Sequence, residues 1–61
     1  MTYKEALKIK VGDRVKIRDY EVVRTVEEIE TKDIKKLYFR LDNGQLIPHV
    51  HVESVVEHMV I

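Results

Sequence analysis

The sequence predicts an all-β domain of short strands preceded by a helical turn, folded as a small barrel or a half-open sheet. Three observations predict it: short segments of alternating apolar and polar residues, turn residues such as Gly12 and Asn43–Gly44 between them, and a length of only 61 residues. At this size a folded chain buries roughly 60% of the surface that its unfolded form exposes. Little volume is left for an enclosed catalytic cavity, so we expect one non-enzymatic domain over residues 1–61.

The N-terminal residues predict a helical turn followed by the first strand. Thr2 and Glu5 have the spacing of a capping box, which marks the start of a helix. Residues 14–18 alternate strictly, so Val15 and Ile17 are expected to face the core. The outward side chains of this strand are then Arg14, Lys16 and Arg18.

Residues 20–30 are ambiguous, because their apolar side chains occur at helix-like intervals while many of them are β-branched. We interpret the segment as a bent strand. A β-bulge at Glu27–Glu28 would let both Val26 and Ile29 face the core despite their odd separation. A helix over the same residues is the alternative.

The next segments predict a hairpin. After a polar connection over residues 31–35, a third strand over residues 37–41 alternates cleanly, and its inward side chains are Leu37, Phe39 and Leu41. Asn43–Gly44 is then typical of a two-residue type I′ turn, in which both residues have positive φ. The return strand begins at residues 45–47, and Pro48, which lacks an amide hydrogen, places it at a sheet edge or ends it.

The C-terminal third predicts one more strand. We expect one irregular or 3₁₀ turn within residues 49–54 and a final strand over residues 55–61. Its two faces are both rich in apolar residues. One carries Val55, Glu57, Met59 and Ile61, and the other carries Val56, His58 and Val60.

The order of these segments resembles SH3-like barrels of the KOW and Tudor type. The residues that carry the resemblance are Val11-Gly12-Asp13-Arg14-Val15-Lys16-Ile17, the long acidic second strand, and Phe39-Arg40-Leu41-Asp42-Asn43-Gly44 before a Val-rich last strand. The resemblance implies a small five-stranded SH3-like barrel, a last strand beside the first, and a 3₁₀ turn at Val52–Ser54. The aromatic residues do not match the ligand-binding cage or groove of the Tudor and peptide-binding SH3 domains, so no site is carried over.

Charge makes a polyanion a less favoured partner but does not exclude it. The 11 basic and 11 acidic side chains cancel, whereas nucleic-acid-binding domains commonly carry a basic excess. Two outward stripes are nevertheless basic: Arg14, Lys16 and Arg18 on the first strand, and Lys36, Tyr38 and Arg40 on the third. Such stripes would pair with phosphates and stack a base on the tyrosine.

Cross-strand pairing is the competing interpretation of the third-strand stripe. The expected register pairs Ile29 with Leu37, Glu30 with Lys36, Glu28 with Tyr38, and Val26 with Phe39. Pairs of this kind contribute roughly 0.2 to 1 kcal/mol each and neutralise the cations. On the first strand only Glu57 is expected to oppose the basic groups, and this is the best remaining argument for a nucleic-acid partner.

The residues offer no catalytic, cofactor or metal site. Ser54 is the only serine and has no neighbouring glycine, and two glycines are too few for a phosphate-binding loop. His49 and His51 have the spacing to share a strand face, but zinc needs three or four ligands. We interpret both as surface histidines.

We therefore expect a non-enzymatic binding module. A protein partner or self-association is favoured, with Val55, Met59 and Ile61 as the interface, because a small barrel cannot bury both faces of the last strand. The alternatives are a KOW-like nucleic-acid binder that uses the two basic stripes, and a purely structural accessory piece. With neither cysteine nor an apolar stretch that resembles a signal or a membrane span, we expect a cytoplasmic location and no membrane contact.

Overall fold

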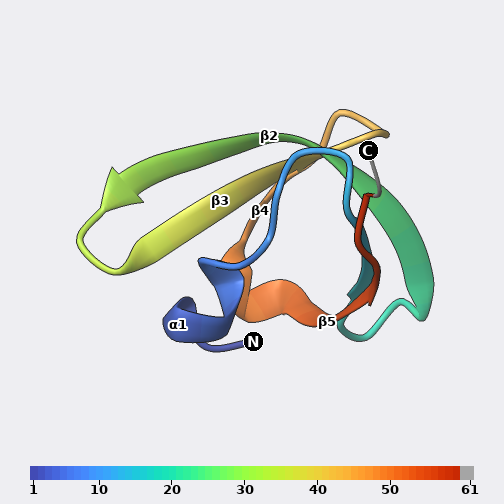
Figure 1. The fold of residues 1–61 in the computed structure, drawn as a ribbon, viewed down its shortest axis with the longest axis horizontal. Coiled ribbons are helices and arrows are strands. Elements are labelled where there is room, and N and C mark those ends of the chain that lie inside the picture. Colours follow the sequence, from blue (N-terminus) through green and yellow to red (C-terminus); the bar gives the residue numbers. More distant parts are fainter. Residues whose placement is uncertain (60–61) are drawn as a thin grey trace.

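The computed structural model describes residues 1–59, which form one short helix and five strands (Figure 1). The elements in chain order are α1 (Tyr3–Ala6), β1 (Arg14–Ile17), β2 (Val22–Asp33), β3 (Lys36–Leu41), β4 (Leu46–Pro48), the 3₁₀ turn η1 (His49–His51) and β5 (Val52–Glu57). No helix in this part of the chain is long and apolar enough to cross a membrane.

The five strands form one antiparallel sheet in the order β4-β3-β2-β1-β5. The expected pairing of the last strand with the first is confirmed. The sheet curls in Figure 1, but no pairing within residues 1–59 joins β4 to β5. The all-β prediction with an N-terminal helical turn is therefore confirmed, and the sheet itself is open.

The N-terminal helix begins where the capping box predicts. The Thr2 hydroxyl accepts a hydrogen bond from the Glu5 amide at 3.2 Å, and a Glu5 carboxylate oxygen accepts one from the Thr2 amide at 3.0 Å. Ala6 is buried, and the Met1 ammonium group donates to the Val52 carbonyl oxygen at 2.8 Å. These contacts fix the helix against the start of β5.

The core is built from residues that alternate along the strands. Its buried apolar side chains are Ala6, Ile9, Val15, Ile17, Val26, Leu37, Phe39, Leu41 and Val52. The inward faces predicted for the first and third strands are both confirmed.

The bent second strand is confirmed, and the predicted bulge lies at Glu27, which has no partner between the pairs Val26–Leu41 and Glu28–Arg40. The prediction that Ile29 shares the core with Val26 was wrong, because its side chain is 37% exposed. β2 has left the core at this point and continues outward as one arm of a hairpin.

The polar connection predicted for residues 31–35 was also wrong. β2 continues to Asp33, which pairs with Lys36 after a second bulge at Lys32. Only Ile34 and Lys35 remain in the turn, and Lys35 has a positive φ of 57°. The β2–β3 hairpin is therefore longer than expected, and in Figure 1 it extends to the left, away from the other strands.

The turn between β3 and β4 differs from the predicted type I′ turn. Gly44 has a φ of 87°, but Asn43 does not have a positive φ. The Leu41 carbonyl oxygen accepts a hydrogen bond from the Gly44 amide at 2.9 Å, and the Leu41 amide donates to the Gln45 carbonyl oxygen at 2.8 Å. This is a three-residue connection closed by a glycine bulge.

The 3₁₀ turn lies within the predicted window, at residues 49–51, but not at Val52–Ser54, where the resemblance placed it. β5 begins three residues earlier than predicted and ends at Glu57. Its pairing with β1 skips Glu53 and Val56, so the strand contains two bulges. At the opposite edge of the sheet, Pro48 pairs with Tyr38.

Candidate functional site

The loop between β1 and β2 holds an exposed tyrosine in a strained backbone. Asp19 and Glu21 have φ values of 73° and 51°, in the left-handed region that costs a non-glycine residue roughly 1–2 kcal/mol. Aspartate tolerates this conformation better than glutamate does. Tyr20 lies between them and is 74% exposed. Strain of this kind persists where the surrounding structure imposes it, and it is concentrated at functional sites.

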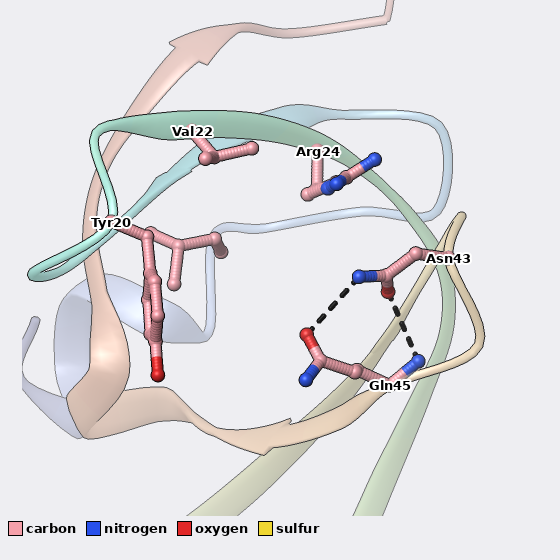
Figure 2. A pocket seen from close by; sticks show the side chains of 6 residues that line it. Tyr20, Val22, Arg24, Asn43 and Gln45 are labelled. Carbon is pink, nitrogen blue, oxygen red and sulfur yellow. Dashed lines mark hydrogen bonds between the residues drawn. The ribbon is translucent and has the colours of Figure 1, made fainter.

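A cavity of about 140 Å³ lies beside this tyrosine, and we call it the Tyr20 socket (Figure 2). It is lined by Ile17, Tyr20, Val22, Arg24, Asn43 and Gln45. In Figure 2 the side chains of Tyr20, Val22 and Arg24 lie on one side of the opening, and those of Asn43 and Gln45 on the other, on the β3–β4 turn. Apolar lining with a few convergent polar groups is the usual composition of a binding pocket.

The polar side of the socket is held in place by hydrogen bonds. The Asn43 side-chain amide donates to the Gln45 Oε1 at 3.1 Å, and the Gln45 backbone amide donates to the Asn43 Oδ1 at 3.0 Å (Figure 2). Arg24 Nη1 lies 3.7 Å from Asp42 Oδ1. The two side-chain amides and the guanidinium are therefore positioned before any ligand arrives.

Arg24 faces the inside of the curled sheet, because it pairs with Val15 and alternates with Val22 and Val26 along β2. Neither this residue nor the socket was predicted from the sequence. The alternation of Val22 and Val26 does contain the signal, but it was obscured by the adjacent Val23 and the bulge at Glu27. The cavity itself depends on the distance between two turns that are far apart in the sequence.

A second, polar hollow adjoins the first and shares Ile17 and Tyr20 with it. Its charged lining residues are Lys16, Asp19, Glu21 and Glu53. Lys16 Nζ lies 3.0 Å from Glu53 Oε2, and the hydrogen bond and charge of Glu53 raise the pKa of this lysine. We call Asp19, Glu21 and Glu53 the acidic rim, since three carboxylates face one lysine.

The two basic stripes are not brought together. The acidic strand β2 lies between β1 and β3 in the sheet and separates the two stripes. On β1, Lys16 is paired with Glu53, and Arg14 lies opposite Glu57 as expected, while Arg18 is exposed.

On β3, the predicted pairing of the basic stripe with β2 was wrong by two residues. Glu28 lies opposite Arg40 and Glu30 opposite Tyr38, while Lys36 pairs with Asp33. The cause is the longer β2, which moves the turn to Ile34–Lys35. The Arg40 guanidinium forms ion pairs with the carboxylates of Glu28 at 3.5 Å and Glu30 at 3.6 Å. The Lys32 ammonium lies 5.5 Å from the centre of the Tyr38 ring.

The predicted C-terminal interface is divided between different environments. Val55 is partly buried and packs against the core. Met59 is 59% exposed and lies over Gly12, where an added Cβ would clash with its sulfur. Ile61 lies outside the described residues.

His49 is not a surface residue, so that prediction was wrong. It is buried, its Nδ1 accepts a hydrogen bond from the Leu37 amide at 3.3 Å, and its ring contacts Tyr3 edge to face at 6.0 Å between centroids. His51 is exposed. Within residues 1–59, no group of three or more metal-ligating side chains comes together.

Zinc at neutral pH is expected to give no stoichiometric isotherm in calorimetry. The Nδ1 of His49 already accepts a hydrogen bond from a backbone amide, and its ring is buried. Zinc could bind this imidazole only if the core opened. A one-to-one isotherm at low micromolar affinity that His51→Ala abolishes would contradict this expectation.

No protein-family model, curated protein or solved structure matches this sequence.

Proposed function

We propose that the chain is a non-enzymatic binding module of the SH3-like barrel type, and that a segment of a partner protein docks at the Tyr20 socket. The pairing of β5 with β1 and the 3₁₀ turn before β5 support the SH3-like part of the proposal. The cysteine-free sequence supports a cytoplasmic, reducing environment.

The observation that carries the proposal is the exposed tyrosine between two strained residues at the mouth of a cavity. Tyrosine buries a large rigid ring at low entropic cost and is enriched in the central contacts of protein interfaces. Nothing in the core requires Tyr20 to stand where it does, since its side chain is 74% exposed. A ligand contact accounts for both the exposure and the strain.

The lining also indicates which segment fits. A cavity near 140 Å³ is close in size to one that binds a molecule such as benzene, so it admits one aliphatic side chain. Ile17 and Val22 supply apolar contact, and the acidic rim next to Tyr20 favours cations beside the inserted group. We therefore propose a ligand segment with an aliphatic residue flanked by lysine or arginine.

A nucleic-acid partner is supported less well. The cations of Lys16 and Arg40 are already matched to carboxylates, and acidic β2 separates the two stripes. A polyanion approaching β1 would also meet the acidic rim.

We expect a short peptide with isoleucine between lysines to bind at the socket. In an NMR titration of the isotope-labelled chain, it should shift the backbone amides of residues 19–21 and 43–45. Tyr20→Ala should weaken binding at least about tenfold, the effect of losing a central aromatic contact. The same peptide with glutamates in place of lysines should bind much more weakly, and added salt should weaken binding of the lysine peptide.

The matched control is Tyr38→Ala, which removes another partly exposed tyrosine on the outer face of β3 and should leave peptide binding unchanged. Shifts centred on residues 55–59 would favour the C-terminal surface instead. Salt-sensitive binding of a single-stranded oligonucleotide, with no peptide binding, would overturn the proposal in favour of the nucleic-acid alternative.

A further inference from the structure

The turn of the β2–β3 hairpin has an unusual composition for its position. Ile34 is 92% exposed, the highest value among the exposed large hydrophobic side chains of residues 1–59. Two-residue hairpin turns favour glycine, asparagine and aspartate, yet this one contains isoleucine and a lysine with a φ of 57°. Turn formation does not explain an aliphatic side chain here.

The residues around Ile34 are basic. Residues 31–36, which we call the hairpin tip, contain Lys32, Lys35 and Lys36 and one acidic residue, Asp33. The tip is therefore a single aliphatic side chain surrounded by three lysines and one carboxylate, on a hairpin that extends away from the core (Figure 1).

The Tyr20 socket has the complementary arrangement. Its apolar wall consists of Ile17, Val22 and the ring of Tyr20, and beside them the acidic rim sets three carboxylates against one lysine. The guanidinium of Arg24 lies on the wall of the same cavity, 3.7 Å from the Asp42 carboxylate.

We propose that the socket receives the hairpin tip of a second copy of this chain, with Ile34 in the cavity and the lysines on the acidic rim. This inference rests on the proposed function of the socket and names its occupant. The tip matches the socket in polarity and charge, because its aliphatic side chain suits the apolar wall and its lysines suit the acidic rim. An anionic lipid or nucleic-acid surface would use the lysines of the tip but would leave the acidic rim without a role.

The same contact cannot form within one molecule. The 12 residues of β2 separate the tip from the β1–β2 loop, and Figure 1 shows the two at opposite ends of that strand. Each copy therefore offers its tip to one neighbour and its socket to another. Such a head-to-tail contact produces either an open chain of molecules or a closed ring.

Sedimentation velocity of the wild-type chain tests the inference directly. The mass-average molecular weight should rise above the monomer value of 7.3 kDa as concentration increases from about 10 μM towards about 1 mM, the range of weak interfaces. Raising the salt concentration should reverse the rise, because the paired charges are solvent-exposed. Ile34→Asp and, separately, Lys35→Glu with Lys36→Glu should each weaken association at least about tenfold.

A complementation experiment identifies the two surfaces. The Ile34→Asp variant keeps its socket, and a variant with Asp19→Lys and Glu21→Lys keeps its tip, so each should stay monomeric alone. Mixed together they should form a one-to-one dimer that does not grow further. Met59→Lys, at the predicted C-terminal interface, is the matched control and should associate like the wild type.

A wild-type chain that stays monomeric over this range overturns the inference, as does association that survives Ile34→Asp or disappears with Met59→Lys. Binding of the isoleucine–lysine peptide at the socket of a monomeric chain would leave the proposed function standing without this occupant. Absence of peptide binding together with a monomeric chain would remove both. Binding of the wild type to anionic vesicles without self-association would assign the tip to a membrane surface instead.

Discussion

Phe39→Ala is expected to lower the free energy of unfolding by roughly 3 to 5 kcal/mol, the usual cost of removing a buried aromatic ring. Phe39 is fully buried on β3 and lies opposite Ile29 on β2 and Ile47 on β4. Within residues 1–59 the core has nine buried apolar side chains, so few neighbours are available to fill the space that the ring leaves. Small domains are stable by about 5 to 15 kcal/mol, so the variant should be close to unfolding in chemical denaturation at 25 °C.

Tyr38→Ala is the control, because it removes an aromatic ring from the adjacent position on the opposite face. That ring contacts the Lys32 ammonium near solvent, so the expected loss is below about 1 kcal/mol. Equal losses for the two variants would show that the alternation of β3 has been assigned to the wrong face.

Asp13→Ala is expected to cost about 2 to 4 kcal/mol, because one buried carboxylate joins two segments, its own loop and the residues that follow β5. Its Oδ2 accepts a hydrogen bond from the Lys10 amide at 2.9 Å, and its Oδ1 accepts one from the Met59 amide at 2.9 Å. His58 Nδ1 lies 3.0 Å from Oδ2. Each backbone amide left without a partner costs roughly 1–3 kcal/mol. Denaturant titration measures the loss, and hydrogen exchange should show faster exchange of the Met59 amide.

The Asp13 carboxylate should also make the stability of the fold depend on pH in the acid range. Burial raises the pKa of Asp13, but the hydrogen bonds from Met59, Lys10 and His58 outweigh burial and lower it below the ordinary value of 3.8. A carboxyl whose folded pKa is lowered contributes stability that is complete above the unfolded pKa and is lost as pH falls through the folded pKa.

Wild-type stability should therefore fall below about pH 5, and Asp13→Asn should flatten that fall while retaining an acceptor oxygen. Asp33→Asn is the matched exposed control and should leave the acid dependence unchanged. An unchanged pH profile in Asp13→Asn, or a loss below about 0.5 kcal/mol in Asp13→Ala, would contradict the structural role of this residue.

Much of the fold could be predicted because side-chain alternation directly reports which face of a strand is buried. Val15 and Ile17 on β1, and Phe39 on β3, follow that rule. The capping box of Thr2 and Glu5 and the bulge at Glu27 are likewise local features, decided by residues a few positions apart. Such features need no knowledge of how distant segments meet.

The errors occurred where distant contacts override local preference. Ile34–Lys35 is a poor turn sequence, so the turn was predicted too early in the chain and the predicted β2–β3 register differs from the observed one throughout. His49 was interpreted as a surface histidine, but the Leu37 amide and the Tyr3 ring give it partners in the core.

The candidate site was the least predictable part. Arg24 was not singled out from the sequence, and the residue type of Glu21 gives no indication of its positive φ. The Tyr20 socket exists because the β1–β2 loop and the β3–β4 turn approach each other when the sheet curls. That approach depends on the strong bend of β2, which the sequence indicated without giving its extent.

The irregularities of the two edge strands of the open sheet affect how readily the protein aggregates at high concentration. Amyloid-like growth begins when a strand of another chain aligns along a straight row of unpaired backbone groups. β4 offers only three residues and ends at Pro48, which has no amide hydrogen to donate. β5 is longer, but the bulges at Glu53 and Val56 bend it twice within six residues. Both edge strands are therefore poor templates for fibril growth. Contacts with other molecules are expected to depend on side chains rather than on backbone pairing at the edges.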